Sequence, residues 1–479
     1  METYDLAVIG GGSAGLTAAI VGGRVRAKTI LIDIEEFGGD CLAFGCVPSK
    51  AVIASAKAAH TMRRAAEYGL EPVAVKADIV AVLKRMEAIR EAVGKYEKPE
   101  VLEEDGVETA FGGARFISPT ELEIGGFSPK YPERRRIKAN YSVIATGSKA
   151  VAPNIPGLAQ AGFLDHVSFF SQTRMPKSLV VIGGGPIGCE LGQTMARLGC
   201  QVTLLQGNLH LLKSDDTENT AILVKSLRDE GLTVNLGARV IGVRTEGNEK
   251  VVTADTYNGR VEHRCEEILV AAGRRPIMDG LNLKAAGVAF TDKGVTVDDT
   301  LATSASNIFA AGDVTGGPQF THWAEYEGRI AARNALFRGS DKRSYRILPW
   351  VTFTEPEVAR VGLLEEEAKK LDPKTMVYRF PYSRIDRALC EGEGVGQIKV
   401  IVDKNEKILG VHAVGPHAGE VLPEWVLAME KDVTLREIGS AIHAYPTFVR
   451  INRRVGDLPF LTQGLTTLQK LAAKFKPRP

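Results

Sequence analysis

The chain has 479 residues, with 60 lysines and arginines against 58 aspartates and glutamates, so its net charge of +2 gives no argument for a nucleic-acid partner. Six cysteines in a chain of this length exclude a disulfide-stapled scaffold and are typical of a reducing compartment. At roughly 150 residues per domain, the length predicts about three domains with a large core.

The first residues enter an apolar strand directly, at residues 4–9, without the basic segment or cleavage site of a signal peptide. We find no run of about 18 or more uncharged apolar residues, so we expect no membrane-spanning helix. The sequence therefore predicts a cytoplasmic protein.

The first strongly patterned unit is a strand, a glycine-rich turn, a helix and a second strand, written YDLAVIGGGSAGLTAAI and then TILID. In such a unit Gly10 permits the tight turn, Gly12 lets the backbone approach a pyrophosphate, and Gly15 allows the helix to pack closely on the strand. The pyrophosphate then lies at the helix N-terminus, where free N–H groups favour an anion. Asp33, at the end of the second strand, is placed to accept a hydrogen bond from a ribose hydroxyl. This unit predicts a dinucleotide-binding site.

A cysteine pair follows at once in FGGDCLAFGCVPSK. Cys41 and Cys46 have no second Cys or His pair nearby to complete a zinc site, and a structural disulfide is disfavoured in a reducing compartment. We therefore favour a redox-active disulfide beside the dinucleotide, and we predict no resident metal. If this stretch is helical, Lys50 faces the same way as Cys46 and favours its thiolate, although a solvated lysine is the alternative.

A second copy of the unit begins at KSLVVIGGGPIGCELGQ and ends in VTLLQ. Two copies, each in the strand, turn and helix context that the motif requires, predict two dinucleotide sites. The three glycines of the second turn are Gly183, Gly185 and Gly188. Glu190, shortly after them, is a candidate ion-pair partner for the lysine that follows the cysteine pair.

The second copy differs from the first at the end of its second strand. Gln206 stands where the first copy has Asp33, so the carboxylate that selects NAD is absent. No arginine directly follows to hold a 2′-phosphate, and His210 and Lys213 are weak substitutes. We expect NADPH slightly over NADH.

Other strand ends carry small or polar residues that suit cofactor contacts. VIATGS ends in a turn with Thr146 and Gly147, and VAAGRRP is a similar strand end around Gly273. Asp313, in NIFAAGDVTGG, follows another apolar strand. Ligands of open α/β sheets bind outside the carboxyl ends of strands, so Asp313 is placed to bond a cofactor hydroxyl, with a helix cap as the alternative.

Segments rich in glycine and proline bracket the second unit like hinges. We predict an α/β protein with a first domain of residues 1–150 and 275–345, a second domain of residues 151–274 inserted into it, and a separate α+β domain of residues 346–479.

The C-terminal end is basic and has apolar residues at helical spacing. Its basic residues are Lys470, Lys474, Lys476 and Arg478, and its apolar residues are Leu465, Leu468, Leu471 and Phe475. We favour a helix packed on its own domain, and docking of a basic amphipathic helix on a membrane surface is the alternative.

The order of these motifs resembles the class I flavin disulfide reductases, which include lipoamide dehydrogenase, glutathione reductase and mercuric reductase. The resemblance covers essentially the whole chain. It implies two Rossmann-like domains, with FAD in the first and NADPH or NADH in the second, and a C-terminal interface domain that makes a homodimer.

The resemblance also implies roles for individual residues. Cys46 is similar to the thiol next to the flavin, and Cys41 to the thiol that meets substrate. Lys50 and Glu190 match an ion pair near the flavin N5. The residues matched to FAD contacts are Gly39, Ala114 and Asp313.

The family pattern breaks near the C-terminus, in HAYPTFVR. Tyr445 fills the position of a catalytic histidine, and Arg450 fills that of the glutamate that orients it. An imidazole base typically contributes about 10²–10⁴-fold, and tyrosine, with an ordinary pKa near 10, is a poor substitute. His443 lies on the same face of an extended segment and is a weak candidate for the missing base.

A tyrosine at this position is similar to mercuric reductases, although their N-terminal metal-binding domain and terminal cysteine pair have no counterpart in this sequence. We therefore expect an NAD(P)H oxidoreductase whose acceptor is a soft metal ion such as Hg(II) or Cu, a quinone or another small oxidant. The alternatives are a dihydrolipoamide dehydrogenase-like enzyme and a redox sensor or electron-transfer protein with little turnover.

Overall fold

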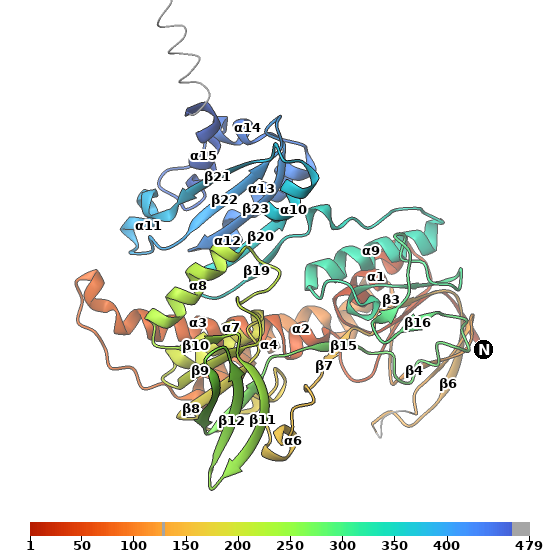
Figure 1. The fold of residues 1–479 in the computed structure, drawn as a ribbon. Helices are drawn as coiled ribbons and strands as arrows, with labels where there is room; N and C mark the ends of the chain where they lie inside the picture. The colour runs from red at the N-terminus through yellow and green to blue at the C-terminus, as the bar shows by residue number, and fades with distance from the viewer. Residues whose placement is uncertain (127–129, 462–479) are drawn as a thin grey trace, which may run out of the picture.

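The computed structural model describes residues 1–126 and 130–461 (Figure 1). Three larger sheets organise these residues, two of them mainly parallel and one antiparallel. The fold is α/β with two Rossmann-like units and a C-terminal α+β domain, as the sequence predicted. The basic segment predicted near the C-terminus lies outside the described residues.

The first sheet has the order β3-β2-β1-β6-β5-β4, and β18 also pairs with β6. Its strands are β1 (Glu2–Ile9), β2 (Thr29–Asp33), β3 (Val107–Phe111), β4 (Ala114–Ser118), β5 (Glu121–Ile124), β6 (Arg135–Ile144) and β18 (Ile308–Ala310). β1 is parallel to both β2 and β6, and its register places Ile9 opposite Ile32 and Ile144. The carboxyl ends of these strands therefore meet at one edge of the sheet.

Helices cover this sheet and extend from its edge. α1 (Ser13–Arg24) follows the first glycine turn and packs against α9 (Thr321–Phe337). After β2 come one short helix and two longer ones: α2 (Gly39–Ala43), α3 (Cys46–Arg63) and α4 (Ile79–Gly94), with the short α5 (Pro99–Glu104) next. Asp78 accepts hydrogen bonds from the backbone of Val80 and Ala81, which fixes the start of α4. Buried residues of both faces, including Leu6 and Ile30, make the core.

The second unit repeats this arrangement with a parallel sheet of order β10-β9-β8-β14. Its strands are β8 (Ser178–Ile182), β9 (Gln201–Gln206), β10 (Thr233–Leu236) and β14 (Glu267–Val270). α7 (Pro186–Arg197) follows the second glycine turn, and α8 (Thr217–Asp229) follows its Asp216 cap. An antiparallel meander of β11 (Arg239–Glu246), β12 (Glu249–Thr256) and β13 (Gly259–Cys265) projects from this unit (Figure 1). The second unit also contains the short α6 (Leu158–Ala161). The small hairpin of β16 (Phe290–Thr291) and β17 (Gly294–Val295) lies beside the first sheet, where Val295 joins its core.

Two short strands join the first and second units. β7 (Ser148–Ala150) pairs antiparallel with β15 (Arg274–Pro276), so the chain leaves the first sheet and returns to it side by side. This ribbon lies where the sequence predicted hinges.

The C-terminal sheet has the antiparallel order β19-β20-β23-β22-β21. Its strands are β19 (Trp350–Thr352), β20 (Glu357–Gly362), β21 (Met376–Pro381), β22 (Gln397–Val402) and β23 (Ile408–Gly415). Its helices are α10 (Glu365–Leu371), α11 (Asp386–Cys390), α12 (Ala418–Val421), α13 (Pro423–Glu430), α14 (Leu435–Ser440) and α15 (Arg450–Gly456). Trp425 is fully buried at its centre, and Figure 1 shows this sheet apart from the other two.

Among the described residues, one helical segment, Gly39–Arg63, is long and apolar enough to cross a membrane by length and composition. A third of its 18-residue apolar window is buried inside the protein, and α3 packs against α4 and α7. This packing favours a core helix, and the prediction of no membrane-spanning helix remains a prediction.

Candidate active site

One cavity of about 1890 Å³ lies where the first unit, the second unit and the C-terminal domain meet. It is lined by residues of both glycine turns, by both cysteines of the predicted pair, and by Lys50 and Glu190. The other predicted residues that line it are Asp33, Gly39, Ala114, Thr146, Gly147, Gln206 and Asp313. Gly15, Gly188, Gly273 and Tyr445 are not among its lining residues.

The two glycine turns have the same geometry. Gly10 and Gly183 have φ values of +107° and +112°, in the left-handed region that favours glycine. A Cβ on Gly15 would lie 1.7 Å from the Gly10 carbonyl oxygen, and one on Gly188 would lie 1.9 Å from the Gly183 oxygen. The third glycine of each turn therefore serves helix packing and not ligand contact, which explains why neither lines the cavity.

Both helix N-termini are open to a ligand. Gly12 and Gly185 are the N-caps of α1 and α7, and neither helix has a side-chain hydrogen bond at its cap. A Cβ on Gly12 would come no closer than 3.8 Å to another residue, and one on Gly185 would meet nothing within 4 Å. Each site thus combines free backbone N–H groups with room for a pyrophosphate.

The residues at the ends of β2 and β9 make equivalent hydrogen bonds. Asp33 Oδ2 accepts from the Gly11 N–H at 2.6 Å, and Gln206 Oε1 accepts from the Gly184 N–H at 3.1 Å. Burial raises the pKa of Asp33, and hydrogen bonds from backbone N–H groups partly oppose this. Gln206 also donates to the His210 carbonyl at 3.3 Å, so the second site presents a neutral amide where the first presents a carboxyl.

The two thiols lie close together, Cys41 on α2 and Cys46 at the start of α3. A hydrogen bond from Cys41 lowers the pKa of Cys46 to about 6, against the effect of burial, with further help from Thr321 and the charge of Lys50. The same hydrogen bond, together with burial, raises the pKa of Cys41. At neutral pH the reduced pair therefore holds one proton on Cys41 and a thiolate on Cys46.

Lys50 and Glu190 form an ion pair between α3 and α7, as the sequence predicted, with 2.8 Å between Nζ and Oε2. The other carboxylate oxygen of Glu190 accepts from the backbone N–H of Phe353 at 2.9 Å, and Lys50 Nζ lies 4.3 Å from the centre of the Phe353 ring. Glu190 is buried, so a partner on each oxygen offsets the cost of removing its charge from water. These contacts join the three parts of the chain at the cavity.

Asp313 lies in the short helical turn Gly312–Thr315 and does not cap it. Its Oδ2 accepts from Ser148 Oγ at 2.6 Å, and burial raises its pKa, partly opposed by that hydrogen bond and by the charge of Arg274. The Thr146 hydroxyl is already engaged, because it donates to the Ile277 carbonyl at 2.6 Å. The cofactor-binding roles of these residues stay predictions.

In the segment that departs from the family pattern, Tyr445 does not line the cavity of its own chain that holds Cys41 and Cys46. Tyr445 is 63% exposed, and the guanidinium of Arg450 lies 4.9 Å from the centre of its ring. A hydrogen bond to Asp386 raises the pKa of Tyr445, so its deprotonated, basic form is even scarcer near neutral pH. His443 is buried, with one ring nitrogen 3.0 Å from the Ala441 carbonyl and the other 3.0 Å from Glu424. His443 therefore has no free nitrogen with which to replace the missing base.

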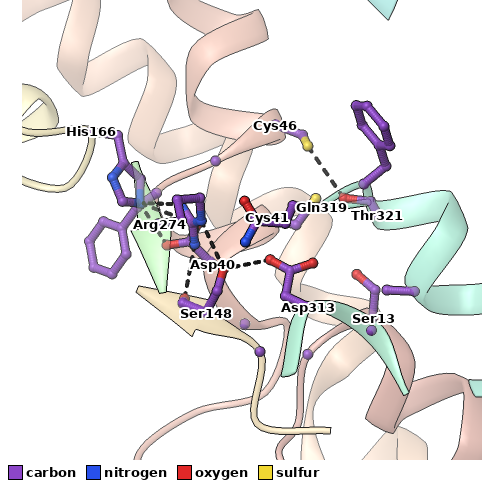
Figure 2. Close-up of a pocket in the computed structure, with 18 of the residues that line it drawn as sticks. Ser13, Asp40, Cys41, Cys46, Ser148, His166, Arg274, Asp313, Gln319 and Thr321 are labelled. Atoms are coloured by element: carbon purple, nitrogen blue, oxygen red, sulfur yellow. Dashed lines mark hydrogen bonds and ion pairs between the residues drawn. The ribbon is translucent and has the colours of Figure 1, made fainter. Parts of the chain in front are cut away.

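Four residues beside the thiols were not predicted from the sequence. Thr321 Oγ1 lies 3.4 Å from Cys46 Sγ, and Asp40, His166 and Arg274 form a polar cluster next to Cys41 (Figure 2). Asp40 and Arg274 lie within motifs that the sequence analysis singled out, so their positions were a usable signal. Nothing in the local sequence indicates His166 or Thr321.

The residues around the cavity fit the two cofactors expected from the sequence. Two open helix N-termini suit two pyrophosphates, and the carboxyl or amide beside each suits a ribose. No group of three or more His, Cys, Asp or Glu side chains gathers as a metal site within residues 1–126 and 130–461.

Comparison with known proteins gives matches along nearly the whole chain. Residues 4–328 match the pyridine nucleotide-disulphide oxidoreductase family, and residues 348–453 match the dimerisation domain of that family. The chain is 34% identical to a mercuric reductase of Bacillus cereus, over 93% of this chain and 69% of that protein. It is 38% identical to a dihydrolipoyl dehydrogenase of Thermus scotoductus, over 93% of this chain and 95% of that protein.

A solved structure is similar as well. The HOCl-induced flavoprotein disulfide reductase RclA of Escherichia coli has a TM-score of 0.84 and 26% identity, covering 95% of this chain and all of that one. The dimerisation-domain match supports a homodimer. With two glycine turns, a close thiol pair and these matches, the chain belongs to the pyridine nucleotide–disulphide oxidoreductases, enzymes that use FAD and NAD(P)H.

Proposed function

We propose that this enzyme passes electrons from NAD(P)H through Cys41 and Cys46 to a small acceptor, and that the acceptor is a soft metal ion such as Hg(II) or a copper ion. The observation that carries the proposal is the position of both thiols in the cavity that both glycine turns also line.

In this proposal residues 1–150 and 275–345 bind FAD, residues 151–274 bind the nicotinamide dinucleotide, and residues 346–479 form the interface of a cytoplasmic homodimer. The first glycine turn, with Asp33, holds the pyrophosphate and ribose of FAD. The second turn, with Gln206, holds NADPH in preference to NADH. The remaining proposed FAD contacts are Gly39, Ala114, Thr146, Gly147 and Asp313. Gly273 is a proposed contact of the nicotinamide dinucleotide.

FAD, when bound, would carry the electron pair of a hydride from the nicotinamide to the sulfur atoms. The chain's own residues prepare the thiols for this transfer. Lys50 stabilises the thiolate of Cys46, and Glu190 holds Lys50 in place. When the reduced pair closes to a disulfide, Cys41 loses its proton and two electrons leave for the acceptor.

The departure at Tyr445 supports a metal ion over a disulfide substrate. Exchange between dithiols and disulfides moves protons, but the pKa of Tyr445 is raised and both ring nitrogens of His443 are engaged by Ala441 and Glu424. A soft metal ion binds thiolates directly and needs no proton shuttle of this kind. The similarity to mercuric reductases and to RclA, of which a Cu(II) complex is known, agrees with such an acceptor.

Tyr445 belongs to the dimerisation region and is exposed, as is Ile442 nearby at 97%. Leu427, which is 61% exposed and lines the cavity, lies in the same region. We propose that this apolar surface is covered in the homodimer, and that Tyr445 of one chain approaches the cavity of the other.

The second candidate function is that of a dihydrolipoyl dehydrogenase. The identity of 38% to the Thermus scotoductus enzyme, over nearly its whole length, favours it. It requires efficient turnover of dihydrolipoamide without the histidine base.

An acceptor panel run on the purified holoenzyme and on a Cys41→Ser variant separates these functions. We expect NAD(P)H-dependent reduction of Hg(II) or Cu(II) that the variant loses, and slow turnover of dihydrolipoamide. Fast dihydrolipoamide turnover would establish the second candidate instead. Slow reoxidation of the reduced enzyme by every acceptor would favour the alternative of a redox sensor with little turnover.

A further inference from the structure

A continuous set of polar contacts connects the residue before Cys41 to the ribbon between the first and second units. Asp40 Oδ2 lies 2.9 Å from Arg274 Nη2, and Asp40 Oδ1 lies 3.0 Å from His166 Nε2. His166 Nε2 also lies 3.1 Å from Arg274 Nη1. Figure 2 shows these three side chains gathered on one side of Cys41.

Arg274 is itself fixed by the ribbon of β7 and β15. Its Nε donates to Ser148 Oγ at 2.8 Å, and its Nη2 donates to the Ser148 carbonyl at 2.9 Å. Ser148 Oγ in turn donates to Asp313 at 2.6 Å. Asp40 is therefore tied to a side chain that cannot move without breaking several hydrogen bonds.

The cluster is sheltered from water, which makes its contacts stronger than those of a surface pair. The side chains of His166 and Arg274 are 8% and 16% exposed, and that of Asp40 is 37% exposed. Burial alone would raise the pKa of Asp40, but the hydrogen bond from His166 and the charge of Arg274 hold it below its usual value. Asp40 is thus a carboxylate that the second unit holds by charge as well as by geometry.

The hydrogen-bond partner of His166 Nε2 depends on which ring nitrogen carries the proton. With a proton on Nε2 it donates to Asp40, and without one it accepts from Arg274. In both states Arg274 remains paired with Asp40.

Asp40 and Cys41 are adjacent on α2, a helix of five residues, so the direction of one side chain constrains that of the other. In Figure 2 the thiols lie on the side of Thr321, whereas Asp40 lies on the side of Arg274 and Ser148. Anchoring Asp40 on one side therefore fixes the backbone from which the Cys41 thiol projects on the other.

We propose that His166 and Arg274 are positioning residues for Cys41: they hold Asp40, and with it the start of the redox-active loop, so that the thiol keeps its place beside Cys46. This rests on the proposed function, in which Cys41 meets the acceptor. Steps that need the Cys41 thiol then depend on the cluster, whereas reduction of the flavin by NAD(P)H does not. A displacement of about 1 Å at a reacting group can cost up to about 100-fold in rate.

The test uses the FAD-loaded enzyme and the variants Asp40→Asn, His166→Phe and the double variant. In enzyme reduced anaerobically with NAD(P)H, we expect the rate of Cys41 alkylation by iodoacetamide, measured by peptide mass spectrometry, to change about 10-fold. We expect flavin reduction to change by less than about 2-fold. If His166 acts through Asp40, the double variant is no worse than the stronger single variant.

The neighbouring arginine provides a matched control. Arg275 follows Arg274 on β15 but pairs with the exposed Asp279, so Arg275→Met should behave as wild type whereas Arg274→Met should not. If Asp40→Asn or His166→Phe loses FAD, the same alkylation measurement is made on His166→Asn, which is a smaller change. Unchanged Cys41 alkylation in the FAD-loaded variants would overturn the proposal. Because alkylation requires no acceptor, this failure is distinct from failure of the proposed metal-ion function.

Discussion

Lys50 Nζ lies 2.8 Å from Glu190 Oε2, although 140 positions separate the two residues in the sequence. The pair spans two helices that each begin at a site of the candidate chemistry, α3 at Cys46 and α7 at the second glycine turn. It places a positive charge one helical turn from a thiol, in a cavity that both dinucleotide sites share.

The charge on Lys50 should be measurable in the titration of Cys46. The pKa of Cys46 is lowered to about 6, first by the hydrogen bond from Cys41 and then by Thr321 and Lys50. Alkylation of Cys46 in the reduced enzyme should therefore follow a midpoint near pH 6 and slow as the pH falls below it. Lys50→Met should move this midpoint upward, and Lys57→Met, which removes an exposed lysine further along α3, should not. An unshifted midpoint in Lys50→Met would contradict the electrostatic argument.

Substitutions in the two glycine turns should affect the two cofactors separately. Gly15→Ala places a Cβ against the Gly10 carbonyl and should lower FAD content by about 10-fold or more, measured by absorbance of the purified protein. Gly188→Ala should retain FAD but lose its reduction by NAD(P)H. Gly192→Ala on the same helix makes only ordinary contacts and is the control. If Gly188→Ala loses FAD and Gly15→Ala does not, the assignment of FAD to the first unit and of the nicotinamide dinucleotide to the second would be reversed.

Gln206 should decide the choice of nicotinamide dinucleotide. Gln206→Glu introduces a carboxylate that accepts from a 2′-hydroxyl and repels a 2′-phosphate. We expect kcat/KM for NADPH to fall about 10-fold or more and that for NADH to rise. Gln206→Leu removes the amide without adding charge, so it should weaken both without reversing the preference. An unchanged ratio in Gln206→Glu would place the selection elsewhere in the site.

Restoring the histidine and the glutamate that the family pattern has at positions 445 and 450 should restore the turnover of thiol substrates. The double variant Tyr445→His/Arg450→Glu supplies an imidazole and a carboxylate to orient it, and we expect dihydrolipoamide turnover to rise by about 10²-fold. Tyr445→His alone should gain less, because Arg450 would face the new imidazole. Turnover by the wild type equal to that of the double variant would show that the base is not needed.

Much of this architecture could be predicted from the sequence because its signals are local. The turns around Gly10 and Gly183 are each encoded within a few residues, and the spacing of Cys41 and Cys46 is specific. The ion pair of Lys50 with Glu190 was a candidate because each residue lies close to a motif, and the family resemblance supported it, since no local pattern joins residues so far apart.

The remaining contacts depend on how distant segments pack. His166 meets Asp40 from 126 positions away, and Thr321 meets Cys46 from 275 positions away. A lone histidine and a threonine at a helix start have ordinary structural uses, so neither stands out in the sequence. In the proposed homodimer the place of Tyr445 relative to the thiols would depend further on a second chain, which no pattern within one chain describes.

Electrons from NAD(P)H should reach the two thiols of the cavity. To test this directly, the oxidised FAD-loaded enzyme is reduced anaerobically with NADPH or NADH, and newly alkylated cysteines are mapped by mass spectrometry. We predict that Cys41 and Cys46 become labelled together, and that Cys189, Cys200 and Cys265, which are buried, do not. Reduction of the flavin without new labelling at Cys41 and Cys46 would show that the electrons do not reach these thiols.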